Sequence, residues 1–177
     1  MAVNGKTLLE LAPIKNMLTT KEKFGEVSHG LGEAGYDIRL KQTIMFRSSV
    51  KDKDCHDTDT AAAKWKEDDG HTYGYYNNGR FIIASAMEEF DMPECLVGIV
   101  HDKSTWARKG LSVFNTVVEP GWKGWLTLEL VYHGNENLII PAGSGIAQVI
   151  FHRLSDVAHY EGKYQNQEDK PVPARKS

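Results

Sequence analysis

Short hydrophobic stretches follow one another through the second half of the chain, and turn-forming residues separate them. Stretches of this length, bounded by signals such as Pro120-Gly121 and Pro141-Ala142-Gly143, are typical of β-strands joined by tight turns. The pattern predicts strands at six places: Phe81–Ala86, Leu96–Val100, Ser112–Val118, Trp125–Tyr132, Asn137–Ile140 and Ile146–His152.

The first half of the chain is less regular. It predicts a short helix around Thr7–Met17 that Pro13 interrupts, and a strand with extended chain over residues 35–50. Residues 51–79 are polar and predict an excursion with at most a short helix near Ala61–Lys66. Many short strands and few helical patterns favour one all-β domain over residues 1–177, built as a distorted β-barrel or jelly roll.

One polar residue stands out in the strand predicted at Trp125–Tyr132. Side chains alternate along a strand, so Trp125, Thr127, Glu129 and Val131 share one face of it. A carboxylate in such a hydrophobic run lies either on a solvated sheet face or in a pocket. The pattern alone leaves both possibilities open.

Composition narrows the class of protein. The chain has 177 residues, of which 41% are hydrophobic and 25% charged, as in ordinary globular proteins. Its formal net charge of −3 argues against broad binding to nucleic acid. No hydrophobic run approaches the roughly 20 residues of a membrane span, and the N-terminus lacks the pattern of a signal peptide. We therefore expect no membrane partner and a cytoplasmic protein.

Neither candidate metal motif in the chain is convincing. The two cysteines, Cys55 and Cys95, form no CxxC pair, which argues against a cysteine-rich zinc site. The stretch KDKDCHDTDT (51–60) offers several potential ligands, but it lacks the glycine and terminal glutamate of a calcium loop. A solvated loop is the favoured interpretation.

The segment KSTWARKG (103–110) carries more specific chemistry. Ser104 and Thr105 can cap a short helical turn that Gly110 ends. Backbone N–H groups would then lie beside Lys103 and Arg108, an arrangement that suits phosphate oxygens. Taken alone, the segment is better explained by an ordinary capped turn with solvated cations, because capped turns of this kind are common.

Several blocks, taken together in order, resemble the dCTP deaminase family, within the superfamily of the trimeric dUTPases. KSTWARKGLSVFNTVVEPGWKGWLTLEL is similar to the central signature of that family. AGYDIRL (34–40) resembles its N-terminal signature, PAGSGIAQVIFHRL (141–154) a following strand and turn, and GKYQNQ (162–167) its C-terminal signature. The resemblance implies a dUTPase-like β-barrel or jelly roll and a homotrimer with sites between neighbouring subunits.

The resemblance also implies roles for particular residues. Glu129 falls on the catalytic glutamate, and Ser104 and Arg108 fall on the functional pair of the phosphate-binding segment. Lys103 stands where many members have arginine, which keeps the positive charge without the bidentate geometry. The substrate-binding positions implied in this way are Lys103, Ser104, Thr105, Trp106, Ala107, Arg108, Glu119, Thr127, Leu128, Tyr160, Lys163 and Gln167.

The implied reaction is the hydrolytic deamination of dCTP, with acceptance of 5-substituted cytosines left open. One carboxyl with a pKa near the working pH could carry all of its proton transfers, and burial would move a glutamate in that direction. Zinc-dependent base deaminases carry a paired HxE and PCxxC signature, and this chain contains no PCxxC. We therefore expect no catalytic zinc, and Mg²⁺ bound with the substrate triphosphate.

Two other functions remain open at this point. A dUTPase, or a bifunctional enzyme that releases dUMP, would use Glu119 to orient a water towards the α-phosphorus. A non-catalytic jelly-roll binding module would need no chemistry at Glu129. The tail at residues 160–177 is polar enough to predict disorder, whereas the family resemblance implies that it closes over the nucleotide as a lid.

Overall fold

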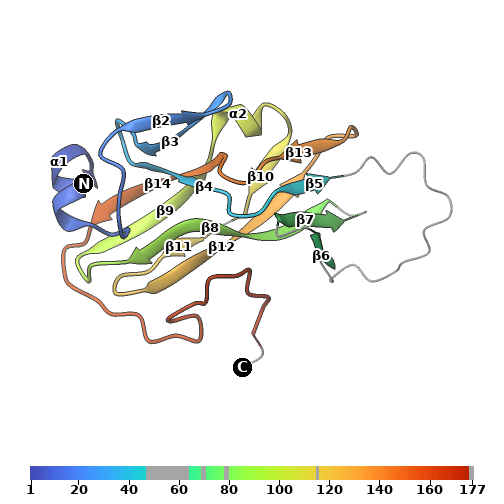
Figure 1. The fold of residues 1–177 in the computed structure, drawn as a ribbon. Coiled ribbons are helices and arrows are strands. Elements are labelled where there is room, and N and C mark those ends of the chain that lie inside the picture. The colour runs from blue at the N-terminus through green and yellow to red at the C-terminus, as the bar shows by residue number, and fades with distance from the viewer. Residues whose placement is uncertain (47–63, 69–70, 78–79, 115, 176–177) are drawn as a thin grey trace.

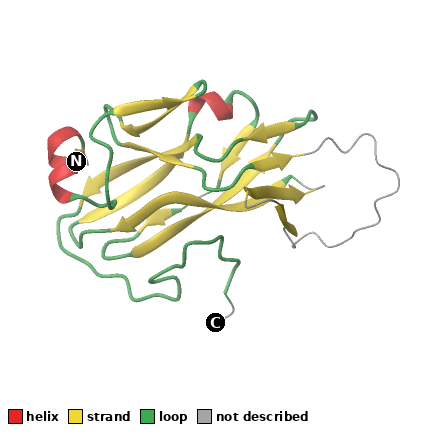
Figure 2. Ribbon diagram, viewed as in Figure 1, coloured by secondary structure: helices red, strands yellow, loops and turns green. Residues whose placement is uncertain are grey.

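The computed structural model describes residues 1–46, 64–68, 71–77, 80–114 and 116–175, with the backbone alone for 64–68 and 71–77. The aspartate-rich stretch 51–60 therefore lies outside the described residues. The two helices are α1 (Gly5–Leu11) at the N-terminus and α2 (Ser104–Ala107) between two strands. All the other described elements are strands, so the prediction of an all-β fold is confirmed (Figure 2).

The largest sheet runs in the order β11-β9-β14-β4-β3-β2, and β1 pairs with β14. Its strands are β1 (Ala2–Val3), β2 (Lys21–Phe24), β3 (Val27–Leu31), β4 (Tyr36–Arg39), β9 (Leu96–Asp102), β11 (Val117–Val118) and β14 (Gly145–Arg153). All of these pairings are antiparallel, and alternate residues of the central strand β14 are buried.

Two smaller sheets complete the fold. One has the order β10-β12-β8 and comprises β8 (Phe81–Asp91), β10 (Leu111–Val113) and β12 (Lys123–Tyr132). The other has the order β13-β5-β7-β6 and comprises β5 (Ile44–Phe46), β6 (Lys64–Asp68), β7 (His71–Asn77) and β13 (Leu138–Ile140). In Figure 1 the C-terminal tail runs beneath β8, β11 and β12.

One hydrophobic core joins these sheets. Its largest side chains are wholly or almost wholly buried and come from the largest sheet and from the sheet of β8 and β12, among them Tyr36, Phe90, Phe151 and Leu128. The sheets form a distorted sandwich, and over the described residues they do not close into a barrel.

The helix predicted at Thr7–Met17 is shorter than expected. It ends at Leu11, and Ala12 adopts a left-handed conformation (φ 44°) with its N–H bonded to the Leu8 carbonyl. Pro13 cannot continue the helix, because its ring fixes φ and it has no N–H to donate. The helix therefore ends at Leu11, although the helical pattern of the sequence continues to Met17.

Two other predictions are wrong in detail. The stretch predicted as one strand at Ser112–Val118 is divided between β10, which pairs with β12, and β11, which pairs with β9 in another sheet. The helix allowed near Ala61–Lys66 is absent from its described part, because residues from Lys64 onward form β6 and pair with β7. The remaining five predicted strands lie within or overlap β8, β9, β12, β13 and β14.

Candidate active site

A cavity of about 650 Å³ lies between the sheet of β8 and β12 and the C-terminal tail. Five of the predicted site residues line it together, although they come from separate parts of the chain: Glu119, Thr127, Glu129, Tyr160 and Gln167. Its other walls are mainly apolar: Phe81, Ile82, Ile83, Thr116, Val117, Val118, Trp122, Leu126, Tyr164, Val172, Pro173 and Ala174.

A tight turn sets Glu119 at the edge of this cavity. Pro120 and Gly121 form the corner, and the Trp122 N–H donates to the Glu119 carbonyl over 3.2 Å. Gly121 has φ +73°, a conformation that glycine adopts without steric cost at the third position of a Pro-Gly turn. The turn leads directly into β12, so Glu119 and the residues of that strand reach the same cavity.

Because side chains alternate along β12, the predicted site residues on this strand are divided between the cavity and the core. Leu128 is fully buried in the core, so its side chain cannot contact a ligand. Thr127 and Glu129, on either side of it, line the cavity. An irregularity in the pairing with β8 falls between Trp125 and Thr127, so the simple alternation expected from Trp125 onward holds only after that point.

Glu129 combines solvent access with apolar surroundings. Its cross-strand neighbour on β8 is Ile83, which lines the same cavity. The side chain is exposed at the cavity surface, yet partial desolvation raises the pKa of its carboxyl above the ordinary 4.5. Of the two possibilities that the sequence left open, the structure favours the pocket over a fully solvated sheet face.

The tail docks on β12 through backbone hydrogen bonds at Gln167. The Gln167 carbonyl accepts from the Trp125 N–H and its own N–H donates to the Lys123 carbonyl, both over 3.2 Å. Its side-chain amide donates to Thr127 Oγ1. Gly124 permits this approach, because a Cβ there would lie 2.4 Å from the Gln167 carbonyl oxygen.

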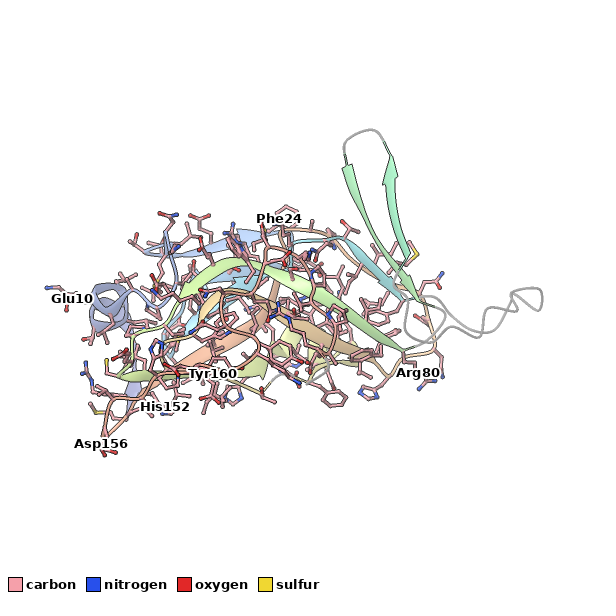
Figure 3. The ribbon with its side chains drawn as sticks, turned by 90° about the horizontal axis from the view of Figure 1, so that it is seen from below. Glu10, Phe24, Arg80, His152, Asp156 and Tyr160 are labelled. Carbon is pink, nitrogen blue, oxygen red and sulfur yellow. The ribbon has the colours of Figure 1, made fainter. Side chains whose placement is uncertain are left out.

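Side-chain contacts hold the rest of the tail. The Trp122 indole N–H donates to the Tyr164 carbonyl over 2.7 Å, and the Gln165 amide donates to the Gly121 and Tyr160 carbonyls. Tyr160 consequently lies over the body of the molecule, whereas Asp156, just before the tail, lies at its end (Figure 3). Composition alone predicts disorder for residues 160–177, but these hydrogen bonds hold the described part of the tail against the body of the molecule.

Two features of the tail differ from expectation. Lys163 does not line the cavity, and its ammonium donates to the Arg175 carbonyl over 2.7 Å. Pro171 is buried, and the Val172 N–H donates to Thr127 Oγ1 over 3.0 Å, so the ordered tail extends beyond the segment with family resemblance. Residues 172–174 line the cavity themselves.

The predicted phosphate-binding segment lies elsewhere. Figure 1 shows α2 at the upper edge and the tail at the lower edge of the molecule, with strands between them. Ser104, Ala107 and Arg108 are exposed there, and no residue from 103 to 108 lines the cavity. Trp106 is buried instead, and its indole N–H donates to the Gly145 carbonyl over 2.7 Å, which anchors the helix to β14.

Lys103 is engaged within its own chain. Its ammonium contacts Asp37 Oδ2 at 2.5 Å and Ser28 Oγ at 3.2 Å, and the exposed fractions of the Lys103 and Asp37 side chains are 11% and 4%. A pair so well shielded costs desolvation and stays together only when both partners are present. This contact ties the start of α2 to β4, where Asp37 lies in the AGYDIRL block.

Sequence reasoning missed several cavity residues, including Ile83, Tyr164 and Val172. Ile83 lies on β8 directly opposite Glu129 of β12. The sequence does not reveal this neighbour, because it does not show in which register the two strands pair. Nothing in the sequence signals that Val172 reaches Thr127.

Comparisons with known proteins identify the family of this chain. A family model described as dCTP deaminase-like matches residues 6–154. A dCTP deaminase of Chlamydia caviae is 32% identical over 157 residues, which cover 83% of this chain and 80% of the relative. One of Protochlamydia amoebophila is 33% identical over 154 residues, with the same coverage. The chain therefore belongs to the dCTP deaminase-like family, as its motifs predicted.

Solved structures support the fold. The 2′-deoxycytidine 5′-triphosphate deaminase of Agrobacterium tumefaciens matches with a TM-score of 0.53 at 16% identity, over 86% of this chain and 48% of that one. A dUTPase of phage phi11 of S. aureus matches with a TM-score of 0.50 at 12% identity, over 84% of this chain and 92% of that one. The dUTPase-like character of the fold is thereby confirmed.

Neither a membrane-spanning helix nor a metal-binding cluster occurs among the described residues. No helix in this part of the chain is long and apolar enough to cross a membrane. The same residues contain no group of three or more His, Cys, Asp or Glu side chains placed to hold a metal ion.

Proposed function

We propose that this protein catalyses the hydrolytic deamination of dCTP to a deoxyuridine nucleotide and ammonia, with Glu129 as the proton shuttle. The observation that supports this most directly is the cavity, in which Glu129, Thr127 and Gln167 lie together between β12 and the tail. The dCTP deaminases that share about a third of its residues support the same reaction.

Glu129 has the chemistry that the reaction requires. The carboxylate takes a proton from water, and the oxygen of that water forms a bond to C4 while N3 receives the proton. A second transfer moves the hydroxyl proton to the amino group, and the C4–N bond breaks to release ammonia. A raised pKa suits a group that must accept and return protons near neutral pH.

The proposal requires a second copy of the chain. In Figure 1, α2 lies at the opposite edge of the molecule from the C-terminal tail. Ser104 of α2 and the following Arg108 do not line the cavity that contains Glu129, so one chain alone does not bring these residues to one nucleotide. In a homotrimer the exposed α2 of one subunit faces the cavity of its neighbour, and three composite sites result. Light scattering during turnover tests this: an active monomer would contradict it.

The triphosphate is expected to carry its own Mg²⁺ as part of the substrate. Mg²⁺ usually binds through substrate phosphates and waters with one or two carboxylates, rather than in an all-protein cage. Glu119, which lines the cavity, is the carboxylate that we expect to approach such an ion through water. The protein itself supplies the shaped apolar wall and the proton shuttle.

Chromatography of the products is the direct experiment. We expect incubation with dCTP to yield ammonia and one deoxyuridine nucleotide, and incubation with 5-methyl-dCTP to show whether the apolar wall admits a 5-substituent. If dCTP stays intact while the protein binds it, the deaminase proposal fails and a binding module remains.

The position of Glu119 supports a second candidate function, in which the same site also hydrolyses the triphosphate. It lines the cavity on the turn before β12, where a carboxylate could orient water towards the α-phosphorus. Release of dUMP and diphosphate from dUTP with Mg²⁺ would support this bifunctional enzyme. Loss of that release in Glu119→Gln, with deamination retained, would assign it to Glu119.

A further inference from the structure

Arg175 connects the end of the described tail to an earlier part of the same tail. Its guanidinium Nη1 donates to the Lys163 carbonyl, and its own carbonyl accepts from the Lys163 ammonium over 2.7 Å. Its backbone N–H donates to the Tyr164 hydroxyl over 3.1 Å. Lys163, Tyr164 and Arg175 thus form a reciprocal set of contacts, which we call the clasp.

Several contacts on the same few residues distinguish the clasp from an ordinary surface contact. Exposed charged side chains usually contribute little when they pair singly, because water competes with them. Here the Lys163 ammonium and the Arg175 guanidinium lie 5.4 Å and 5.7 Å from the centroid of the Tyr164 ring, at the distance of cation–π contacts. Two cations repel each other, so the ring and the two carbonyls compensate for that repulsion.

The clasp closes a loop of the tail at the cavity. The base of this loop is fixed to the body of the molecule, because the Tyr164 carbonyl accepts from the Trp122 indole N–H. Residues 172–174 of the loop line the cavity, and they are held at one end by the bond from the Val172 N–H to Thr127 and at the other by the clasp. The cavity that they line measures about 650 Å³, within the range of small-molecule sites, so the closed loop leaves room for a ligand.

We infer that Arg175 is a positioning residue that latches the tail as a lid at the nucleotide site, an inference that rests on the proposed function of the cavity. The clasp is made entirely by tail residues, so it stabilises the closed tail in the same way with or without a nucleotide in the cavity. Such a contact slows the opening of the lid without adding a bond to the ligand. Arg175 therefore controls how fast the nucleotide enters and leaves, and lid opening limits turnover in many enzymes.

Hydrogen exchange at the Val172 amide tests the latch without any nucleotide. Arg175→Ala removes the guanidinium from the Lys163 carbonyl and from the Tyr164 ring, but it keeps the backbone contacts of the clasp. We expect exchange at Val172 to accelerate by about 5- to 50-fold, the range for one net hydrogen bond together with an exposed cation–π contact. Unchanged exchange in the folded variant would overturn the inference.

Lys170→Ala is the matched control for the loss of a tail cation. Lys170 is exposed and its ammonium pairs with Glu168, outside the clasp, so its removal should leave Val172 exchange as it is in the wild type. Tyr164→Phe removes the hydroxyl that accepts from the Arg175 N–H and should accelerate exchange as Arg175→Ala does. If Lys170→Ala accelerates exchange as much as Arg175→Ala, any loss of charge loosens the tail and the latch is refuted.

The rate of dCTP release separates the latch from the proposed function. In a Glu129→Gln background, in which turnover should be slow, Arg175→Ala should speed dCTP dissociation by about the factor by which Val172 exchange accelerates. The Kd should change less, because the clasp stabilises the closed tail with and without nucleotide. A Kd that rises as much as the dissociation rate would indicate a direct contact with the nucleotide and contradict the latch. Faster exchange with both dCTP constants unchanged would support the clasp and count against this cavity as the nucleotide site.

Discussion

Gly124→Ala should release the tail from β12. A Cβ at position 124 would lie 2.4 Å from the Gln167 carbonyl oxygen and 2.5 Å from its nitrogen, both backbone atoms that cannot rotate away. The tail must therefore move, and Gln167 loses its bonds to Trp125, Lys123 and Thr127. At about 0.5–1.5 kcal/mol for each hydrogen bond, docking weakens by about 1.5–4.5 kcal/mol.

Hydrogen exchange at the Trp125 and Gln167 amides measures this loss. Because each 1.4 kcal/mol corresponds to a factor of ten, exchange at these two amides should accelerate by roughly 10- to 1,000-fold. Limited trypsin digestion should also cut faster after Lys163. Both readouts report the tail, and neither depends on catalysis.

Gly143→Ala is the matched control for backbone strain. Gly124 and Gly143 both have positive φ, +125° and +85°, so alanine is strained at either position. At Gly143 the nearest atoms are those of Phe24 at 3.8 Å, which is ordinary contact far from Gln167. If Gly124→Ala and Gly143→Ala show the same exchange at Trp125, the docking described for the tail is wrong.

Three further predictions concern activity. Deletion after His159 should leave a folded protein with weak dCTP binding and slow turnover, and unchanged kcat/KM would contradict a lid. Arg108→Ala should lower kcat/KM by about 10- to 150-fold, through loss of a charged hydrogen bond of ~1.5–3 kcal/mol. Lys109→Ala, its exposed cationic neighbour, should behave like wild type, and equal losses would contradict a specific role for Arg108. On the acid side of the pH profile, kcat/KM should fall with a midpoint above pH 4.5, because desolvation raises the pKa of Glu129. A midpoint at or below pH 4.5 would contradict the raised pKa.

The same raised pKa has a consequence for stability. The folded protein holds the Glu129 proton more tightly than the unfolded chain does. The contribution of this proton to stability is therefore complete below about pH 4.5 and is lost as the pH rises through the folded-state pKa. Glu129→Gln should flatten that part of the stability profile, in the direction of higher stability at neutral pH.

Local patterns were sufficient for the strands that carry the site. The hydrophobic run at β12 and the Pro-Gly turn before it are local signals, so Glu119, Thr127 and Glu129 could be placed together from sequence. The pairing of strands is not local. The break between β10 and β11 arises because the chain leaves the sheet of β12 and joins β9, and no residue between Ser112 and Val118 signals that change.

Polar elements were the hardest to predict. All four residues of β2 are exposed, so this edge strand has no hydrophobic pattern to detect. The tail docks mainly through backbone hydrogen bonds, which composition does not encode. Lys103 was expected at a phosphate, but its pairing with Asp37 spans 66 residues and depends on how β4 packs beside α2.

The most direct test of the central proposal is kcat, measured alongside the Kd for dCTP, in Glu129→Gln. Glutamine keeps the shape and the hydrogen-bonding reach of glutamate but cannot accept and return a proton. If Glu129 is the shuttle, the variant folds, binds dCTP with nearly unchanged Kd, and loses about 10²- to 10⁴-fold in kcat. A variant that retains more than about a tenth of the wild-type kcat would contradict the role of Glu129 as the proton shuttle.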